Sequence, residues 1–155
     1  MVFRLPNFDD FRWPFLPYRY GQKSDLVFIA LHGRPGEDGA IQQKLEEIGL
    51  PYNGSNKESS SITIDKYRTN EILKSNGFLI ADHLLISKQD WLTDKQRFLP
   101  LLQNQIKYPF IAKPVDDGCS SAVKKINNIE EFEAFCILLF REAEELDLVA
   151  ANILH

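Results

Sequence analysis

A short loop at residues 32–39 gathers side chains that could do chemistry on a small charged molecule. The segment HGRPGEDG holds a histidine, an arginine and two adjacent carboxylates among three glycines. Backbone N–H groups at the start of a following helix, together with His32 and Arg34, would receive an anionic group such as a carboxylate. Alternatively, the carboxylates only cap the next helix, where the helix dipole favours negative charge. Composition leaves both interpretations open.

Two lysines stand at positions where a positive charge needs an explanation. Lys66 falls in the first turn of an expected helix, where the dipole disfavours cations, so it either lies on a solvated face or meets a phosphate. Lys113 falls inside an apolar stretch, where an unpaired ammonium costs several kcal/mol. It therefore either extends to water from an edge strand or holds a phosphate. The turn GCSS (118–121) would add N–H and O–H donors.

A strand–loop–helix unit must position the first of these groups. Residues 26–31 are continuously apolar, which is typical of a parallel strand buried on both faces. After the loop, Ile41, Leu45 and Ile48 form one apolar helical face, and Gly49 is suited to end that helix. Because ligands collect at the carboxyl ends of parallel strands, this order favours a binding site at the loop.

The remaining elements carry the two lysines. They are expected as a connection over 49–61, a helix from Ser61 or Thr63 to Gly77, a strand over 78–86, and a weaker helix over 94–106 that is broken or bounded by Pro100. A hairpin of strands 108–115 and 122–126 follows, and then a helix that is capped by Asn128 and Glu131 and continues to Leu146. Residues 1–20, with seven aromatics and three prolines, predict an extended arm over an apolar surface, and an aromatic ligand site is the alternative.

Composition excludes several classes of protein. The 155 residues carry a net charge of −4 and are 44% hydrophobic and 26% charged, as in a globular protein with no electrostatic basis for binding nucleic acid or an anionic membrane. No apolar run approaches the roughly 20 residues that cross a bilayer. Cys119 and Cys136 have no metal-type spacing and are expected as reduced thiols. These features predict a cytoplasmic protein.

Three motifs in this order resemble the D-alanine–D-alanine ligases of the ATP-grasp superfamily. They are ALHGRPGEDG with GLPYNGS, then DKYRT, then YPFIAKPVDDGCSS, and the resemblance covers about residues 26–135. It implies an α/β fold that is an ATP-grasp fragment: part of the substrate-binding α/β lobe and the first part of the central ATP-binding lobe. The expected division is an aromatic arm over 1–25, the substrate lobe over 26–62 and the ATP lobe over 63–155.

The resemblance also implies a reaction and roles for residues. In this family ATP phosphorylates one D-alanine, and the amine of a second displaces phosphate from the acyl phosphate to give a dipeptide for peptidoglycan synthesis. Lys66 and Lys113 match lysines that contact ATP phosphates, and the turn that closes over the phosphates matches Gly118, Cys119, Ser120 and Ser121. His32, near the amino acids, Glu37, in a supporting role, and Ser120 are the implied catalytic residues.

The chain departs from the family pattern at several points. Cys119 stands where a serine is expected and Ala122 where a glycine is expected. The first twenty residues do not resemble the family's opening strand. The adenine hinge, the acidic Mg²⁺ ligands and an arginine are expected beyond residue 155, so no metal ligand is assigned here.

The sequence thus predicts an incomplete ligase segment that is inactive alone. Its expected partners are D-amino acids and the remainder of a ligase chain, and a homodimer is permitted. An ATP-grasp ligase with other substrates and a non-catalytic binding or scaffold domain are the alternatives.

Overall fold

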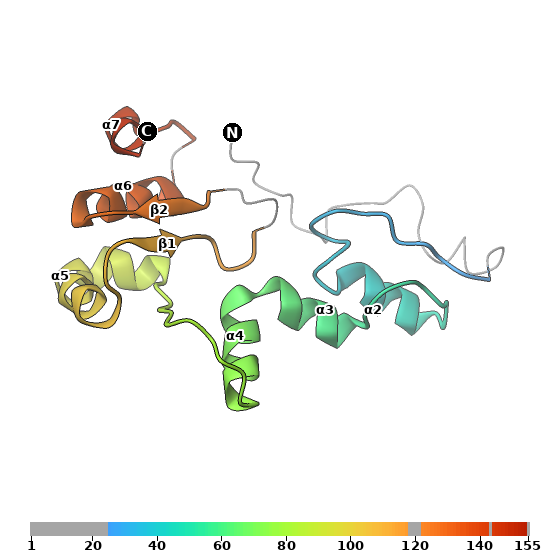
Figure 1. The fold of residues 1–155 in the computed structure, drawn as a ribbon. Helices are drawn as coiled ribbons and strands as arrows, with labels where there is room; N and C mark the ends of the chain where they lie inside the picture. Colours follow the sequence, from blue (N-terminus) through green and yellow to red (C-terminus); the bar gives the residue numbers. More distant parts are fainter. Residues whose placement is uncertain (1–24, 118–121, 143, 155) are drawn as a thin grey trace. The chain divides into compact units, whose positions relative to one another are not determined.

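The computed structural model describes residues 25–117, 122–142 and 144–154 (Figure 1). The chain divides into two compact units, Met1–Thr69 and Asn70–His155, which we call unit 1 and unit 2. The predicted aromatic arm and the predicted turn at 118–121 lie outside the described residues.

Helix α2 of unit 1 (Ala40–Glu47) ends as its sequence predicts. Gly49 has a φ of +67°, and its N–H donates to the carbonyl of Glu46 at 3.1 Å. The N–H of Leu50 donates to the carbonyl of Leu45 at 3.0 Å, which completes a Schellman motif. Leu45 and Leu50 are both buried, so burial of apolar side chains also stabilises the end of the helix.

The prediction of a buried parallel strand over 26–31 is wrong. This segment makes an isolated parallel bridge between Val27 and Tyr52, and the Val27 N–H donates to the carbonyl of Pro51 at 2.9 Å. Leu26 and Phe28 are 60% and 75% exposed. A parallel strand that is buried on both faces needs covering layers, and the described part of unit 1 supplies none for these side chains.

Helices α3 (Lys57–Ile64) and α4 (Lys66–Ser75) replace one predicted connection and one predicted helix. The Asn56 side chain caps α3 by accepting from the N–H of Ser59 at 2.9 Å. Asp65 separates the helices and caps α4, since its Oδ1 accepts from the Arg68 N–H at 2.8 Å. The predicted stop at Gly77 is confirmed, because the residue has a φ of +83° directly after the last turn.

Unit 2 contains a two-stranded antiparallel hairpin and three helices beyond α4. The elements are α5 (Lys88–Gln105), β1 (Phe110–Ala112), β2 (Lys124–Ile126), α6 (Ile129–Phe140) and α7 (Leu148–Ile153) (Figure 1). The strands pair Phe110 with Ile126 and Ala112 with Lys124, which confirms the predicted hairpin with shorter strands. Helix α6 packs against β2, α5 and α7.

Two predictions in the first half of unit 2 are wrong. Residues 78–86 form no strand, and Phe78 and Leu79 are exposed. A strand exists only when a second strand pairs with it, and no described segment does so here. The predicted weak helix over 94–106 starts earlier, at Lys88, because Ser87 and Asp90 form a capping box, and it continues through Pro100.

The predicted start of α6 is confirmed and its predicted end is wrong. Asn128 Oδ1 accepts from the N–H of Glu131 at 2.9 Å, and Glu131 in turn accepts from the N–H of Asn127 at 2.8 Å. The helix ends at Phe140 and does not reach Leu146. Glutamates at 142, 144 and 145 would extend it with negative charge at the end where the dipole disfavours it.

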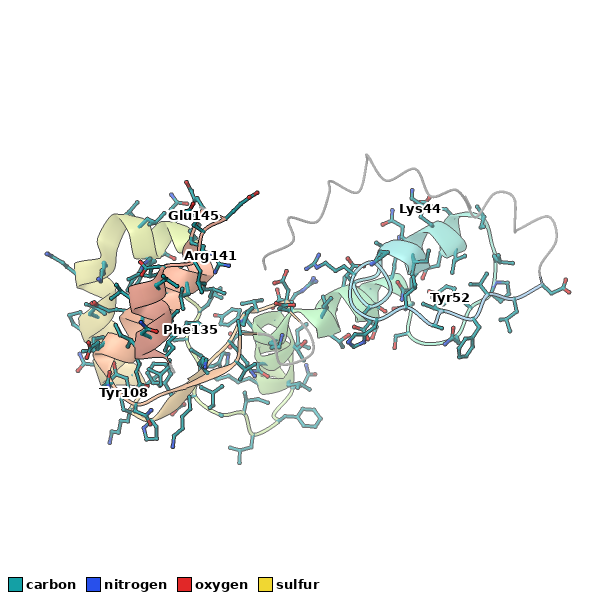
Figure 2. The ribbon with its side chains drawn as sticks, turned by 90° about the horizontal axis from the view of Figure 1, so that it is seen from above. Lys44, Tyr52, Tyr108, Phe135, Arg141 and Glu145 are labelled. Carbon is teal, nitrogen blue, oxygen red and sulfur yellow. The ribbon has the colours of Figure 1, made fainter. Side chains whose placement is uncertain are left out.

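The core of unit 2 is a cluster of side chains from α5, β2 and α6. It consists of Trp91, Leu102, Ile126, Phe132, Phe135 and Cys136. Tyr108 packs against this cluster (Figure 2). Burial raises the pKa of the Cys136 thiol to about 12, so this cysteine is a free, protonated core residue. Among the described helices, none is both long enough and apolar enough to cross a membrane.

Candidate functional site

The glycine loop of unit 1 brings His32 and Glu37 together. The imidazole Nδ1 of His32 lies 3.4 Å from Glu37 Oε1, and the other carboxylate oxygen accepts from the Gly33 N–H at 2.8 Å. The N–H of Glu37 donates back to the Gly33 carbonyl at 2.9 Å. Both side chains remain largely exposed. The loop therefore presents an imidazole and a carboxylate side by side to solvent.

The start of α2 is already occupied by a carboxylate of the chain itself. Asp38 Oδ1 accepts from the Ala40 N–H at 3.0 Å, and its other oxygen lies 3.5 Å from the Arg34 guanidinium. This is the arrangement that the helix-capping interpretation predicts. An external anion at this helix end would have to displace Asp38, so the structure favours the capping interpretation for Arg34 and Asp38.

Gly39, directly before α2, lies close to the backbone of Lys57 at the start of α3. It has a φ of +92°, and a Cβ built on it would lie 2.5 Å from the carbonyl oxygen of Lys57. A real Cβ does not approach that closely, and a backbone carbonyl has little freedom to move. Gly33, in the same loop, also has a positive φ of +70° but faces open space. An alanine at Gly33 would therefore suffer backbone strain alone, whereas an alanine at Gly39 would suffer both backbone strain and a steric clash.

We expect Gly39→Ala to lower the free energy of unfolding of unit 1 by about 2–3 kcal/mol, against about 1 kcal/mol for Gly33→Ala. Both variants force an alanine into the left-handed region, and Gly39→Ala also displaces α3. Amide hydrogen exchange of α2 in both variants measures the difference. Equal losses would contradict the close approach of the two helices.

A second contact between α2 and α3 involves Glu46. Its Oε1 accepts from the Tyr52 hydroxyl at 2.6 Å and from the Lys57 N–H at 3.1 Å. The hydrogen bond from Tyr52, and then that from Lys57, lower the pKa of Glu46, and the same carboxylate raises the pKa of Tyr52 to about 12. Tyr52, labelled in Figure 2, therefore stays protonated as a donor at neutral pH.

An open cleft of about 450 Å³ lies in unit 1 beside the glycine loop. We call it the unit 1 cleft. Its polar lining comes from the loop, from α2 and from the segment up to and including α3: Glu37, Gln42, Asn53, Ser55, Ser60 and Thr63. Sequence reasoning missed Gln42 and Ser60, although both fall on the buried side of their helices.

The two predicted phosphate-binding lysines lie in different units. Lys66 is the first residue of α4 and belongs to unit 1, which ends within this helix at Thr69, and its side chain is half-buried. Lys113 follows β1 in unit 2 and is exposed, so its ammonium has the path to water that its apolar surroundings required. Gly118, Cys119, Ser120 and Ser121 lie outside the described residues. A shared phosphate site of Lys66, Lys113 and this turn stays a prediction.

Ala122 stands where the family pattern has a glycine, and its backbone adopts a conformation that glycine favours. Its φ is +52°, in the left-handed region that disfavours a Cβ. We expect Ala122→Gly to raise the free energy of unfolding of unit 2 by about 0.5–1 kcal/mol. Urea unfolding measures this, with Ala134→Gly inside α6 as a control that should be destabilising. A destabilised Ala122→Gly would contradict the strain.

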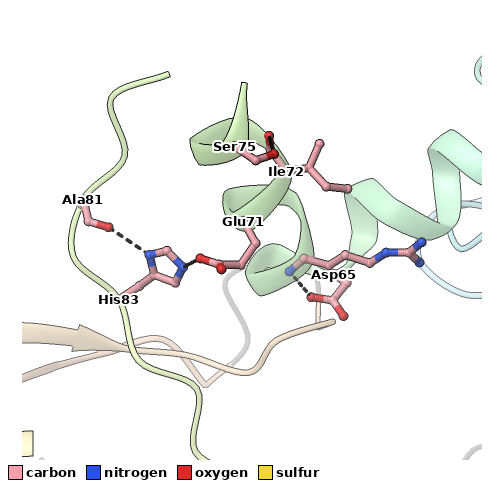
Figure 3. A network of polar contacts seen from close by, with 7 residues as sticks. Asp65, Glu71, Ile72, Ser75, Ala81 and His83 are labelled. Carbon is pink, nitrogen blue, oxygen red and sulfur yellow. Dashed lines mark hydrogen bonds and ion pairs between the residues drawn. The ribbon is translucent and has the colours of Figure 1, made fainter. Parts of the chain in front are cut away.

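A further polar contact in unit 2 has no local sequence signal. Figure 3 shows His83 between the carbonyl of Ala81 and the carboxylate of Glu71, with Nδ1 and Nε2 each 3.0 Å from an oxygen. The contact attaches the irregular segment 78–86 to α4. The two residues are twelve positions apart in the sequence, so only the fold brings their side chains together.

The described residues offer no metal centre. No group of three or more His, Cys, Asp and Glu side chains among them could hold a metal ion.

Comparison with protein families identifies both halves of the sequence. A model described as the D-ala D-ala ligase N-terminus matches residues 17–55, and one described as the D-ala D-ala ligase C-terminus matches residues 72–152, just over half of the chain. The similarity therefore extends beyond residues 26–135 in both directions.

Curated relatives and solved structures agree with these matches. The chain is 34% identical over 119 residues to a D-alanine–D-alanine ligase of Natranaerobius thermophilus, covering 77% of this chain and 33% of the relative. It is 38% identical over 124 residues to the enzyme of Aquifex aeolicus, covering 80% and 40%. The structure is similar to the VanG D-Ala:D-Ser ligase of Enterococcus faecalis (TM-score 0.67, 29% identity, 74% of this chain and 32% of that one) and to the D-alanine–D-alanine ligase of Bacillus anthracis (TM-score 0.63, 32% identity, 76% and 36%).

The mixed helix and strand structure, with these neighbours, is that of a partial ATP-grasp ligase, which confirms the predicted fold class. The chain belongs to the D-alanine–D-alanine ligase family. It spans about a third of the length of the curated relatives that it matches.

Proposed function

We propose that this chain is part of an ATP-dependent ligase that joins the carboxylate of one D-alanine to the amine of a second for peptidoglycan synthesis. The ordered match to both family models, over 17–55 and 72–152, is the observation that carries the proposal. The same matches support an assignment of residues 26–62 to the substrate lobe and of 63–155 to the ATP lobe.

The chain's own residues would supply positioning and charge. Lys66 and Lys113 would hold the phosphates of ATP, with Gly118, Cys119, Ser120 and Ser121 donating hydrogen bonds around them. ATP, when bound, supplies the phosphoryl group that activates the carboxylate. Phosphoryl transfer depends mainly on positioning and charge stabilisation, which lysine side chains can provide. The exposed position of Lys113 supports this role.

The glycine loop would face the amino acids. The proximity of His32 and Glu37, at 3.4 Å, supports a role for this pair at the substrate, with Glu37 orienting the imidazole. Ser120 is the third proposed catalytic residue. The Mg²⁺ that phosphoryl transfer requires would be held by residues outside the described part of the chain. Because Cys136 is a free thiol, we place the reaction in the cytoplasm.

A different acceptor amine is the second candidate. The structural similarity to a D-Ala:D-Ser ligase favours D-serine as the alternative acceptor. A homodimer is a further proposal that the family membership permits.

An assay of dipeptide formation tests the function. ATP, Mg²⁺ and D-alanine are mixed either with the 155-residue chain or with a longer protein that carries this segment at the length of its relatives. We expect D-alanyl-D-alanine and D-alanine-dependent phosphate release only from the longer protein, and D-serine in competition identifies the acceptor.

Two outcomes would contradict these expectations, each in a different way. Dipeptide made by the 155-residue chain would show that the segment is sufficient. A longer protein without activity, and without a rise in melting temperature as ATP is added, would favour a scaffold domain over an enzyme.

A further inference from the structure

Two asparagines of the chain are each followed by a glycine: Asn53 by Gly54 in unit 1, and Asn76 by Gly77 in unit 2. Both pairs are exposed, and a Cβ built on either glycine would meet open space. In such a pair the backbone nitrogen of the glycine can attack the side-chain amide carbon of the asparagine, because glycine has no side chain that hinders the approach. The sequence by itself therefore makes the two pairs equal candidates for spontaneous deamidation.

The attacking nitrogen differs between the two pairs. The N–H of Gly77, directly after α4, donates to the carbonyl of Lys74 at 3.0 Å. The N–H of Gly54 forms no hydrogen bond with any residue that the structure describes. The nitrogen must lose this proton before it attacks, so a hydrogen bond at Gly77 has to be broken first. The nucleophile is therefore available at Gly54 and engaged at Gly77.

The side-chain amide that would be attacked also differs. Oδ1 of Asn53 accepts a hydrogen bond from the backbone N–H of Ile29, and Nδ2 is directed to the carbonyl of the same residue at 3.4 Å. A backbone N–H aimed at a carbonyl oxygen stabilises the negative charge that develops there when a nucleophile adds to the carbon. Among the described contacts of Asn76, the side chain bonds only through its amide nitrogen, which donates to the carbonyl of Ile72 at 2.8 Å. The amide of Asn53 is therefore the more activated of the two.

We propose that Asn53 is a site of spontaneous deamidation in the folded chain, with water as the only co-reactant. The Gly54 nitrogen gives its proton to hydroxide and forms a bond to Cγ of Asn53. The bond from Cγ to Nδ2 breaks, and Nδ2 takes a proton from water and leaves as ammonia. Water then opens the cyclic imide at either of its carbonyls, which gives aspartate or isoaspartate, and no group is oxidised or reduced. The reaction needs neither ATP nor D-alanine, so it is independent of the proposed function.

The modification would change the surroundings of the glycine loop. Asn53 lines the unit 1 cleft, and either product places a new negative charge there. A carboxylate cannot donate to the carbonyl of Ile29, and isoaspartate also lengthens the backbone next to Tyr52, whose bridge to Val27 attaches the segment 26–31. We therefore expect deamidation to loosen this segment, which leads directly into the loop.

Incorporation of ¹⁸O from labelled water into the 155-residue chain tests the inference, with Asn76 as the matched control in the same molecule. The folded chain is incubated in H₂¹⁸O and digested at acidic pH, and mass spectrometry measures the labelled acid at each asparagine. A parallel incubation in urea removes the structural difference between the two pairs. We expect Asn53 to react at least about tenfold faster than Asn76 in the folded chain. In urea the two rates should differ by less than about twofold.

Two proline variants test the activating contact. Ile29→Pro removes the N–H that Oδ1 of Asn53 accepts from, and it should lower the rate at Asn53 in the folded chain by about tenfold. Phe28→Pro is the control on the same segment, because it removes an N–H that Asn53 does not use. It should change the rate at Asn53 by less than about twofold.

Equal rates at the two asparagines of the folded chain, or a faster reaction at Asn76, would overturn the inference and show that the contact with Ile29 restrains Asn53. The wild-type comparison decides this even where a proline variant does not fold. Amide hydrogen exchange of Val27 in the deamidated fraction tests the consequence. Exchange faster than in the unmodified chain supports the loosening of segment 26–31, and unchanged exchange would overturn it.

Discussion

Lys113→Ala is expected to lower D-alanine-dependent phosphate release, in an active ligase that contains this segment, by at least about 100-fold. Lys113 is exposed immediately after β1, and in the sequence it precedes the segment 118–121 that is proposed to cover the phosphates. Such a charge would act most strongly on the negative charge that develops during phosphoryl transfer. The loss should therefore appear mainly in kcat, measured by coupled phosphate release at saturating ATP.

Lys107→Ala is the matched control for this experiment. Lys107 is also exposed, but it precedes β1, whereas Lys113 follows it. Its removal should change kcat less than about twofold. If both variants behave alike, or if Lys113→Ala retains full turnover, Lys113 has no role at the phosphates.

Phe132→Ala is expected to lower the free energy of unfolding of unit 2 by about 3–5 kcal/mol. Phe132 is 4% exposed, and its ring packs edge-on against those of Trp91 and Phe110. The distances between ring centroids are 5.8 Å and 5.7 Å. One side chain on α6 thus contacts both α5 and β1. Truncation would leave a cavity at the point where these three elements meet, and their backbones cannot all close it.

Urea unfolding followed by far-ultraviolet circular dichroism measures this loss. Phe78→Ala is the control, because the Phe78 side chain is 61% exposed. Its truncation should cost less than about 0.5 kcal/mol, as is usual for surface substitutions. A loss below about 1 kcal/mol for Phe132→Ala would contradict the packing of α6 on the hairpin.

Helix ends could be predicted from the sequence wherever their cause is local. Asn128 and Glu131 predicted the start of α6, and Gly49 and Gly77 predicted the ends of α2 and α4, because each signal acts within a few residues through capping or a left-handed backbone. The Asn56 cap of α3 is an equally local signal, but the polar residues around it led to the prediction of a connection instead of a helix.

The hairpin of β1 and β2 was predicted because its two strands are neighbours in the sequence, whereas pairing with a distant segment could not be predicted in the same way. Residues 26–31 and 78–86 have the composition of strands, but strand formation requires a pairing segment, which no local pattern supplies. The side-chain amide of Gln42 donates to the carbonyl of Gly36, six residues earlier, a contact that exists only in the folded loop and helix.

By itself the sequence determined the family, the glycine loop with His32 and Glu37, and the lysine that follows β1, because motifs record residue types in order. Only the tertiary structure decided that Asp38 occupies the start of α2, that Gly39 lies against the start of α3 and that a cleft opens beside the glycine loop. Hydrogen bonds and burial depend on groups that approach one another in space, so both are decided only when the chain has folded.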